Sequence, residues 1–249
     1  MSRRGPLLWA DEFDGPAGAP ADPRTWQPET GGHGWGNAEL QYYTAEPGNA
    51  ALDGAGHLAV TVRRADPGLA AARYDGCRYT SARLITKGLK PVRYGLIEAS
   101  IKIPAGRGIW PAFWLLGTDI GHVGWPACGE IDVMENFGTA PAWVYGTVHG
   151  PGYCGDSGIG GEHAAGARLA DGFHAYAVHW EPDRIRWFFD GTLYHTVTPA
   201  GLGGNPWVFD HDYYLLLNVA VGGTASVAPD RSTSFPQTML VDYVRVYAA

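Results

Sequence analysis

The sequence predicts an all-β protein made of two packed antiparallel sheets. Its 249 residues include 36 Gly and 18 Pro, which favours many turns over long helices. Short runs alternate apolar and polar residues with a period of two, whereas no segment of 11 residues or more carries an apolar stripe of helical period. The chain has no repeat and no low-complexity linker, so we expect one domain over residues 1–249.

The alternating runs place the expected strands along the chain. Asp190 and Gly191 separate two of these runs and form a strong signal for a tight hairpin. The polar, Gly-rich stretch 150–172 is expected to be a loop over one end of a cleft. The expected strands are the alternating runs 57–63 and 94–103, the aromatic and β-branched runs 173–181 and 184–189, and the further runs 192–197, 213–221 and 239–247.

Charge and composition exclude several classes of partner. The net charge is −7 and there is no basic run, which argues against nucleic-acid binding. No apolar stretch reaches the ~18 residues of a membrane helix, and the N-terminal residues lack the apolar region of a signal peptide. Zinc is not expected, because neither a C-x-x-C nor an H-x-x-x-H spacing occurs.

Three cysteines, Cys77, Cys128 and Cys154, allow at most one intramolecular disulfide. The sequence leaves all three pairings open. The alternative is that the three thiols are simply small hydrophobic side chains of the core.

Residues 129–136, with the sequence GEIDVMEN, carry three acids within six positions. In a regular strand alternate residues share a face, so Glu130 and Asp132 would point one way and Glu135 would point into the core. An ionised Glu in an apolar core costs several kcal/mol. A β-bulge that absorbs Met134 as an extra residue would instead place all three acids on one face. We therefore expect a bulge at this point.

Three acids on one face suit glycosidic bond cleavage. The two Glu backbones would lie roughly 13 Å apart, and long side chains leaning inward can approach the ~5–5.5 Å carboxyl separation of a retaining glycosidase. Like charges disfavour joint ionisation, so one Glu should hold its proton and act as an acid. The alternative interpretation is an exposed acidic strand face or a cation site.

Residues 129–136 resemble the signature E-[IL]-D-x-x-E of the family 16 glycoside hydrolases, in the bulged form of the bacterial laminarinase branch. The resemblance implies a β-jelly roll with a substrate cleft across its concave face. It implies retaining endo-hydrolysis of β-1,3-glucans, with Glu130 as nucleophile, Asp132 as assisting carboxylate and Glu135 as general acid/base. Further matching blocks, in the same order, are residues 35–43, 79–84, 108–117, 146–149, 217–223 and 241–247.

Aromatic residues are expected to form the sugar platforms of this cleft. The chain has ten Trp, and sugar sites combine aromatic faces with a few convergent polar groups. Trp110, Ala112 and Trp114 share one face by period two, and Trp125 lies just before the acids. We expect the three Trp side chains to line the cleft; the alternative is packing in the core.

The resemblance also implies polar contacts to the sugar from Asn37, Arg83, His149 and Asn218. Each has a structural alternative. In that alternative Asn37 would make an internal hydrogen bond, Arg83 would make a surface salt bridge, and His149 would make a structural hydrogen bond. For Asn218 the sequence favours neither interpretation.

No cofactor is expected for catalysis, but the resemblance implies a structural calcium ion on the convex face. Its oxygen ligands would come from Glu12, Gly56 and Asp242, the last of which is alternatively a plain surface acid. The expected partner is a β-1,3-glucan, and the expected protein is a secreted monomer because such glucans are extracellular. Alternatives are a hydrolase of mixed-linkage glucan, agar or carrageenan, or a non-catalytic glucan-binding module.

Overall fold

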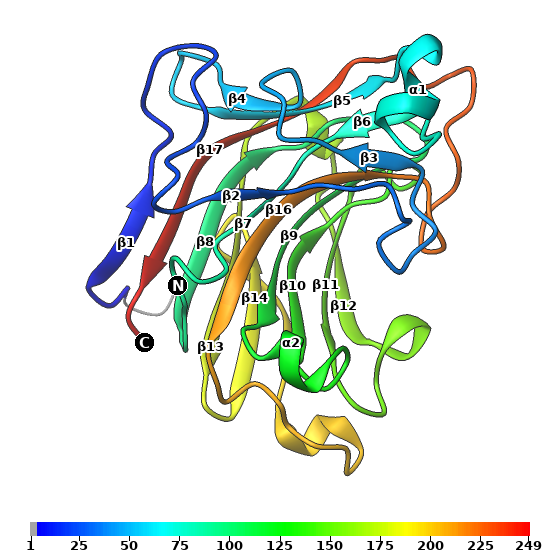
Figure 1. The fold of residues 1–249 in the computed structure, drawn as a ribbon. Helices are drawn as coiled ribbons and strands as arrows, with labels where there is room; N and C mark the ends of the chain where they lie inside the picture. The colour runs from blue at the N-terminus through cyan, green and yellow to red at the C-terminus, as the bar shows by residue number, and fades with distance from the viewer. Residues whose placement is uncertain (1–3) are drawn as a thin grey trace.

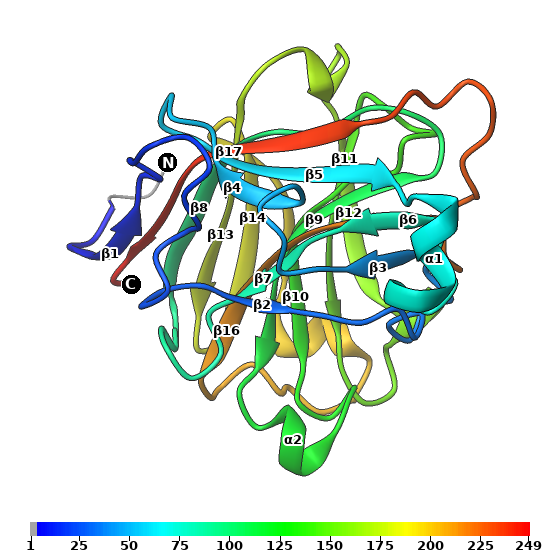
Figure 2. The ribbon, with the colours of Figure 1, turned by 45° about the horizontal axis from the view of Figure 1, so that its top comes forward.

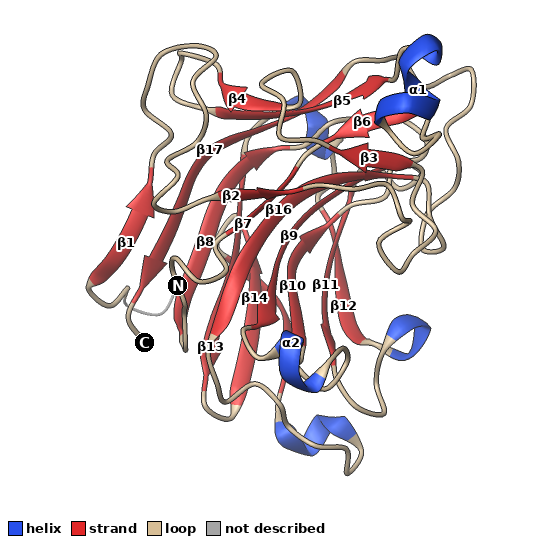
Figure 3. Ribbon diagram, viewed as in Figure 1, coloured by secondary structure: helices blue, strands red, loops and turns tan. Residues whose placement is uncertain are grey.

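The computed structural model describes residues 4–249 and confirms the all-β class. Figure 1 shows two stacked, curved sheets, and Figure 2 gives the same ribbon turned toward the viewer. Strands and loops dominate, and the helices are short pieces at the periphery (Figure 3). In the described part of the chain, no helix has the length and apolar character needed to cross a bilayer.

The larger sheet has the strand order β15-β14-β13-β8-β17-β5-β6-β3, with β1 beside β17 and β4 beside β5. All its pairs are antiparallel except β3 with β6, which is parallel and differs from the expectation of wholly antiparallel sheets. Its strands are β1 (Leu7–Asp11), β3 (Gln41–Tyr43), β4 (Ala50–Leu52), β5 (Leu58–Arg64), β6 (Tyr79–Ser81), β8 (Gly95–Lys102), β13 (His174–Glu181), β14 (Arg184–Phe189), β15 (Thr192–Val197) and β17 (Gln237–Tyr247).

The smaller sheet has the order β12-β11-β10-β9-β16-β7-β2, so the acidic strand β10 lies near its middle. All its pairs are antiparallel. Its strands are β2 (Gln27–Glu29), β7 (Arg83–Ile85), β9 (Ile109–Gly117), β10 (Glu130–Glu135), β11 (Trp143–His149), β12 (Ile159–Ala164) and β16 (Tyr213–Val221).

The hydrophobic core fills the space between the sheets. On β8, Ile97, Ala99 and Ile101 alternate along the strand, so they share one face, and all three are fully buried. They join the same cluster as Phe113 and Leu115 of β9 in the other sheet. Because one face of each sheet is committed to this core, the other face of the smaller sheet is free to carry polar side chains.

The predicted hairpin between β14 and β15 is confirmed. Asp190 and Gly191 have φ values of 44° and 78°, and two positive φ angles are what a type I′ turn requires. The other predicted strands are present with shifts of one or two residues at their ends.

Two features differ from the expectations. Stretch 150–172, expected to be a loop, contains the edge strand β12, which pairs only with β11 and is Gly-rich, so its alternation is weak. The chain also has short helices α1 (Pro67–Arg73) and α2 (Ile120–Val123), and 3₁₀ turns η1 (Gly155–Ser157), η2 (Leu169–Asp171) and η3 (Pro199–Leu202). Helix α1 buries no residue and starts at the local signal Asp66-Pro67, with Asp66 capping Gly68 N.

Candidate active site

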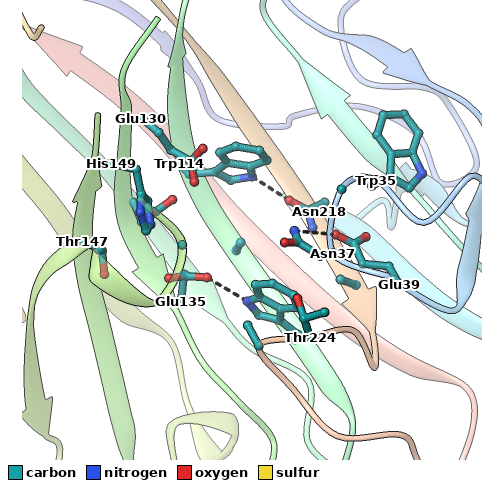
Figure 4. A pocket seen from close by; sticks show the side chains of 18 of the residues that line it. Trp35, Asn37, Glu39, Trp114, Glu130, Glu135, Thr147, His149, Asn218 and Thr224 are labelled. Carbon is teal, nitrogen blue, oxygen red and sulfur yellow. Dashed lines mark hydrogen bonds and ion pairs between the residues drawn. The ribbon is translucent and has the colours of Figure 1, made fainter. Parts of the chain in front are cut away.

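A cleft of about 600 Å³ lies on the face of the smaller sheet that points away from the core. Figure 4 shows its side chains projecting from several strands toward a common space. All three predicted acids line it, namely Glu130, Asp132 and Glu135. So do all seven residues expected to contact sugar: Asn37, Arg83, Trp110, Trp114, Trp125, His149 and Asn218.

A β-bulge places the acids on one face, as predicted. Against β11 the register shifts between Asp132 and Glu135, and against β9 it shifts between Asp132 and Met134. Met134 pairs with Phe113, so in the β9 ladder the extra residue is Val133 and not Met134. Val133 and Met134 are both buried in the core, and Glu135 returns to the cleft.

Each glutamate accepts a hydrogen bond from an indole. Trp125 Nε1 donates to Glu130 Oε2 at 2.8 Å, and Trp110 Nε1 donates to Glu135 Oε1 at 2.9 Å. Trp125 is 48 % exposed, whereas Trp110 is buried. These two hydrogen bonds fix the orientation of the carboxyl groups, a function of Trp110 and Trp125 that the sequence does not reveal.

The carboxyl groups hold their protons more tightly than isolated acids do. Burial is the main cause, and it raises the pKa of Glu130 and Asp132 well above their usual range and that of Glu135 above its own. Charge repulsion adds to the effect, from Asp132 and Glu135 on Glu130 and from Glu135 on Asp132. The three acids therefore titrate as a coupled group that retains a proton toward neutral pH.

His149 lies beside this group and moderates it. Its Nε2 is 3.3 Å from Asp132 Oδ2, and its backbone pairs directly with Glu130 across the β10–β11 ladder. The imidazole lowers the pKa of both Glu130 and Glu135 through its charge. A Cβ on Gly158 would collide with the His149 ring, so the 150–172 segment needs Gly there to pack over this end of the cleft.

Arg83, which also lines the cleft, packs against two indole rings. Its guanidinium lies 4.7 Å from the Trp35 ring centre and 4.8 Å from that of Trp114. Arg83 Nε also donates to the Glu29 carboxylate. Arg83 thus lines the cleft as predicted and also forms a salt bridge, but the pair is largely buried and not the surface salt bridge of the alternative.

A buried hydrogen-bond chain leads away from Trp114. Trp114 Nε1 donates to Asn218 Oδ1 at 2.7 Å (Figure 4). Asn218 Nδ2 donates in turn to the Tyr43 hydroxyl at 3.0 Å. Tyr43 donates in turn to Glu39, and Asn37 Nδ2 donates to the same carboxylate at 3.3 Å. These hydrogen bonds fix the orientation of the Asn37 and Asn218 amides, both of which were expected to bind sugar.

Sequence reasoning missed several cleft residues. Glu39 is buried, and this burial raises its pKa. The aromatic residues Trp35, Phe137 and Tyr145 also line the cleft, and Tyr145 could have been found because it alternates with Thr147 and His149 on β11. Trp35 and Glu39 lie in a turn outside any regular strand, where alternation gives no signal.

The comparisons with known proteins agree with this geometry. A model of the glycosyl hydrolases family 16 matches residues 39–235. The chain belongs to this family. A β-glucanase of Rhodothermus marinus is 41% identical, with 97% of this chain and 84% of that protein covered.

Among solved structures, the laminarinase catalytic domain from Thermotoga maritima superposes with a TM-score of 0.92 at 44% identity, covering 99% of each chain. An endo-β-1,3-glucanase from Pyrococcus furiosus gives a TM-score of 0.89 at 43% identity, covering 97% of this chain and 94% of the other. These likenesses confirm the expected jelly-roll fold of a family 16 member.

The predicted calcium positions lie on or next to strands that pair with or form β17, although they are far apart along the chain. Asp242 is the extra residue at a register shift in β17. Gly56 precedes β5, and Leu58 of β5 pairs with Val241 of β17. Glu12 directly follows β1. Both Glu12 carboxylate oxygens accept hydrogen bonds from Arg245. The residues therefore fit a calcium ion only if Glu12 contributes its backbone carbonyl, and calcium binding stays a prediction.

The three thiols are free in the structure. Cys128 is buried, as the core alternative expects, and burial raises its pKa to about 11. Cys77 and Cys154 are half-buried.

Replacing Trp110 by Phe should shift the basic limb of the pH profile of this family 16 member. The Trp110 indole lowers the Glu135 pKa, so removing it raises that pKa and keeps the acid protonated to higher pH. Loss of one hydrogen bond of ~0.5–1.5 kcal/mol should also reduce kcat/KM about 2- to 10-fold. The measurement is the pH dependence of kcat/KM. Trp114→Phe is the matched control, because its indole donates to Asn218, and an equal shift in both variants would contradict the assignment.

Proposed function

We propose that this protein is an endo-β-1,3-glucanase that cleaves its glucan with retention of anomeric configuration. The observation that carries the proposal is the bulge in β10, which directs Glu130 and Glu135 into one cleft beside aromatic platforms. The family membership and the two glucanase-like structures support the same conclusion.

In the first step, the Glu130 carboxylate attacks the anomeric carbon and the glycosidic C–O bond breaks. Glu135 gives its proton to the departing sugar oxygen. Glu135 holds that proton because burial raises its pKa. Burial acts on Glu130 as well, but the charge of His149 and the hydrogen bond from the Trp125 indole lower the Glu130 pKa and favour the ionised form that attacks. Asp132, buried between them, positions Glu130 through a shared hydrogen bond.

In the second step, water attacks the anomeric carbon of the glycosyl ester and Glu135 takes a proton from it. The ester bond to Glu130 breaks and its carboxylate is restored. Because esterified Glu130 carries no charge, it no longer repels Glu135. By this general argument Glu135 loses its proton more readily when it must act as a base.

The charge and the aromatic lining of the cleft favour a neutral glucan over a sulfated galactan. Among the described residues that line it, Arg83 is the only Lys or Arg, and Glu29 already pairs with it. A sulfated polymer would need further cations at its sulfate groups. Glucose rings instead match the indole and guanidinium faces of Trp35, Arg83 and Trp114.

Release of reducing ends from laminarin, lichenan, agarose and carrageenan tests this proposal. We expect the highest kcat/KM on laminarin, with mixed-size oligomers early in the reaction. Preference for agarose or carrageenan would reject the glucan assignment, and a single small product from the start would reject endo action. Binding of laminarin without any hydrolysis would indicate a glucan-binding module.

We further propose that the protein acts outside the cell and as a monomer. β-1,3-Glucans are extracellular polymers, so the enzyme must be exported to reach them. Catalytic and binding residues all come from one chain, so the cleft needs no partner subunit.

A further inference from the structure

Glu130, Asp132 and His149 form a compact set of potential metal ligands. One donor atom from each lies within 4.8 Å of the other two, and no other group of three or more His, Cys, Asp or Glu side chains over residues 4–249 meets this condition. The mechanism above assigns no metal to these residues. His149 lies 19 residues after Glu130 and 17 residues after Asp132, so a search for short zinc motifs does not find this site.

Two adjacent strands hold the three side chains in place. Glu130 pairs directly with His149 across the β10–β11 ladder, and Asp132 is two residues further along the same face of β10. Sites built on strands are more precise than sites on loops. A cation would therefore find its ligands already oriented.

Asp132 has an oxygen without a hydrogen-bond partner. The side chain is 3 % exposed, and Oδ2, which is turned toward His149, lacks any such partner within the described chain. Buried carboxylate oxygens are normally satisfied, so this one has capacity for a ligand.

The spacing of the donors fits a tetrahedral ion. Bonds of ~2.0–2.1 Å place neighbouring ligand atoms of a tetrahedral zinc ion about 3.3 Å apart. Asp132 Oδ2 and His149 Nε2 are already 3.3 Å apart. One Glu130 oxygen accepts from the Trp125 indole, and the ion would take the place of the proton in the hydrogen bond that Glu130 shares with Asp132.

Charge and ligand type select the kind of cation. A dication between Glu130 and Asp132 would offset the repulsion that these buried acids exert on each other. The imidazole favours zinc, copper or nickel over the hard ions calcium and magnesium, which prefer oxygen ligands.

We propose that Glu130, Asp132 and His149 bind a divalent transition-metal ion of the Zn²⁺ type, and that this ion excludes glucan from the cleft. The binding site stands on the geometry alone; only the exclusion of glucan rests on the proposed function. The site is thus inhibitory, and the metal is not a cofactor.

Zinc binding is measured directly, by competition of tag-free protein with a chromophoric chelator. Cys77 and Cys154 are replaced by Ser throughout so that thiolates do not contribute, and saturating Ca²⁺ is present to fill hard-cation sites. We expect one Zn²⁺ per chain, with an affinity lowered at least ~10-fold in Asp132→Asn and His149→Gln. His57→Gln is the matched control, because His57 pairs with Asp53 outside the cleft and its loss should leave the affinity unchanged.

Absence of saturable binding at millimolar Zn²⁺ would overturn the proposal, as would wild-type affinity in both ligand variants. Circular dichroism verifies that the variants are folded. Co²⁺ provides a second readout, since a site with an imidazole and two carboxylates should give visible absorption bands that are lost in His149→Gln.

A second experiment separates this proposal from the proposed function. Glu135→Gln keeps all three ligands but should not turn over substrate, so Zn²⁺ and a laminari-oligosaccharide can be titrated together. Each ligand is expected to lower the affinity of the protein for the other ligand by the same factor. Zinc binding without any effect of the oligosaccharide would refute competition with glucan and leave the metal site standing, whereas hydrolysis by a protein that binds no zinc would refute the metal site alone.

Discussion

Glu130→Gln and Glu135→Gln are each expected to lower kcat/KM on laminarin by about 10³- to 10⁴-fold. Glu130→Gln removes the nucleophile, and Glu135→Gln removes the proton donor, while the shape of each side chain is kept. The cleft walls that hold the glucan, including Trp114 and Arg83, are unchanged. The dissociation constant for a laminari-oligosaccharide should therefore change little, and this is measured by calorimetry.

Glu162→Gln is the control for these two variants. Glu162 is an exposed residue of β12 that pairs with Tyr145, and it does not line the cleft. Its replacement should leave kcat/KM unaltered. Near wild-type hydrolysis by either Glu130→Gln or Glu135→Gln would remove that residue from the mechanism.

Shortening β10 by two residues should abolish activity, whereas shortening it by one should not. Deletion of Val133 alone leaves a regular strand in which Glu130, Asp132 and the glutamate from position 135 still alternate onto the cleft face. Deletion of both Val133 and Met134 moves that glutamate by one further position, into the core. An ionised Glu there costs several kcal/mol.

We expect the single deletion to retain measurable activity, with a loss of about 10²-fold from displacement of the carboxyl group. The double deletion should lose more than ~10⁴-fold and unfold at a much lower denaturant concentration. Kinetics on laminarin and urea unfolding measure both effects. If the single deletion is folded but as inactive as the double deletion, the face of β10 on which the third acid lies does not determine activity.

The strand pattern shows why much of this site is predictable. Period-two alternation predicts β5 and β8, and aromatic and β-branched runs predict β13 and β14. The period-two rule applied to residues 130–135 exposes the conflict that only a bulge resolves. The bulge could not be placed to the residue, because Val133 and Met134 are both apolar and only the register with Phe113 distinguishes them. Alternation also brings Trp110 and Trp114 to the cleft face.

Other parts depend on contacts that no linear pattern encodes. The indole donors to Glu130 and Glu135 come from residues on a loop and on β9, and their direction is set by tertiary packing. The parallel β3–β6 pair joins short segments of three residues, too brief for a periodic signal. Glu39 was missed because a buried acid is stabilised here by Gln41, Asn37 and Tyr43, which only the fold assembles.

The central claim is that Glu130 and Glu135 act on one glycosidic bond in the two assigned functions. Rescue by azide with an aryl β-laminaribioside tests it directly, because the configuration of the glycosyl azide reports which carboxylate is missing. Glu130→Ala should give the α-azide, formed by direct displacement at the anomeric carbon, and Glu135→Ala should give the β-azide, formed from the glycosyl ester on Glu130. The reverse configurations, or a single configuration from both variants, would contradict the account.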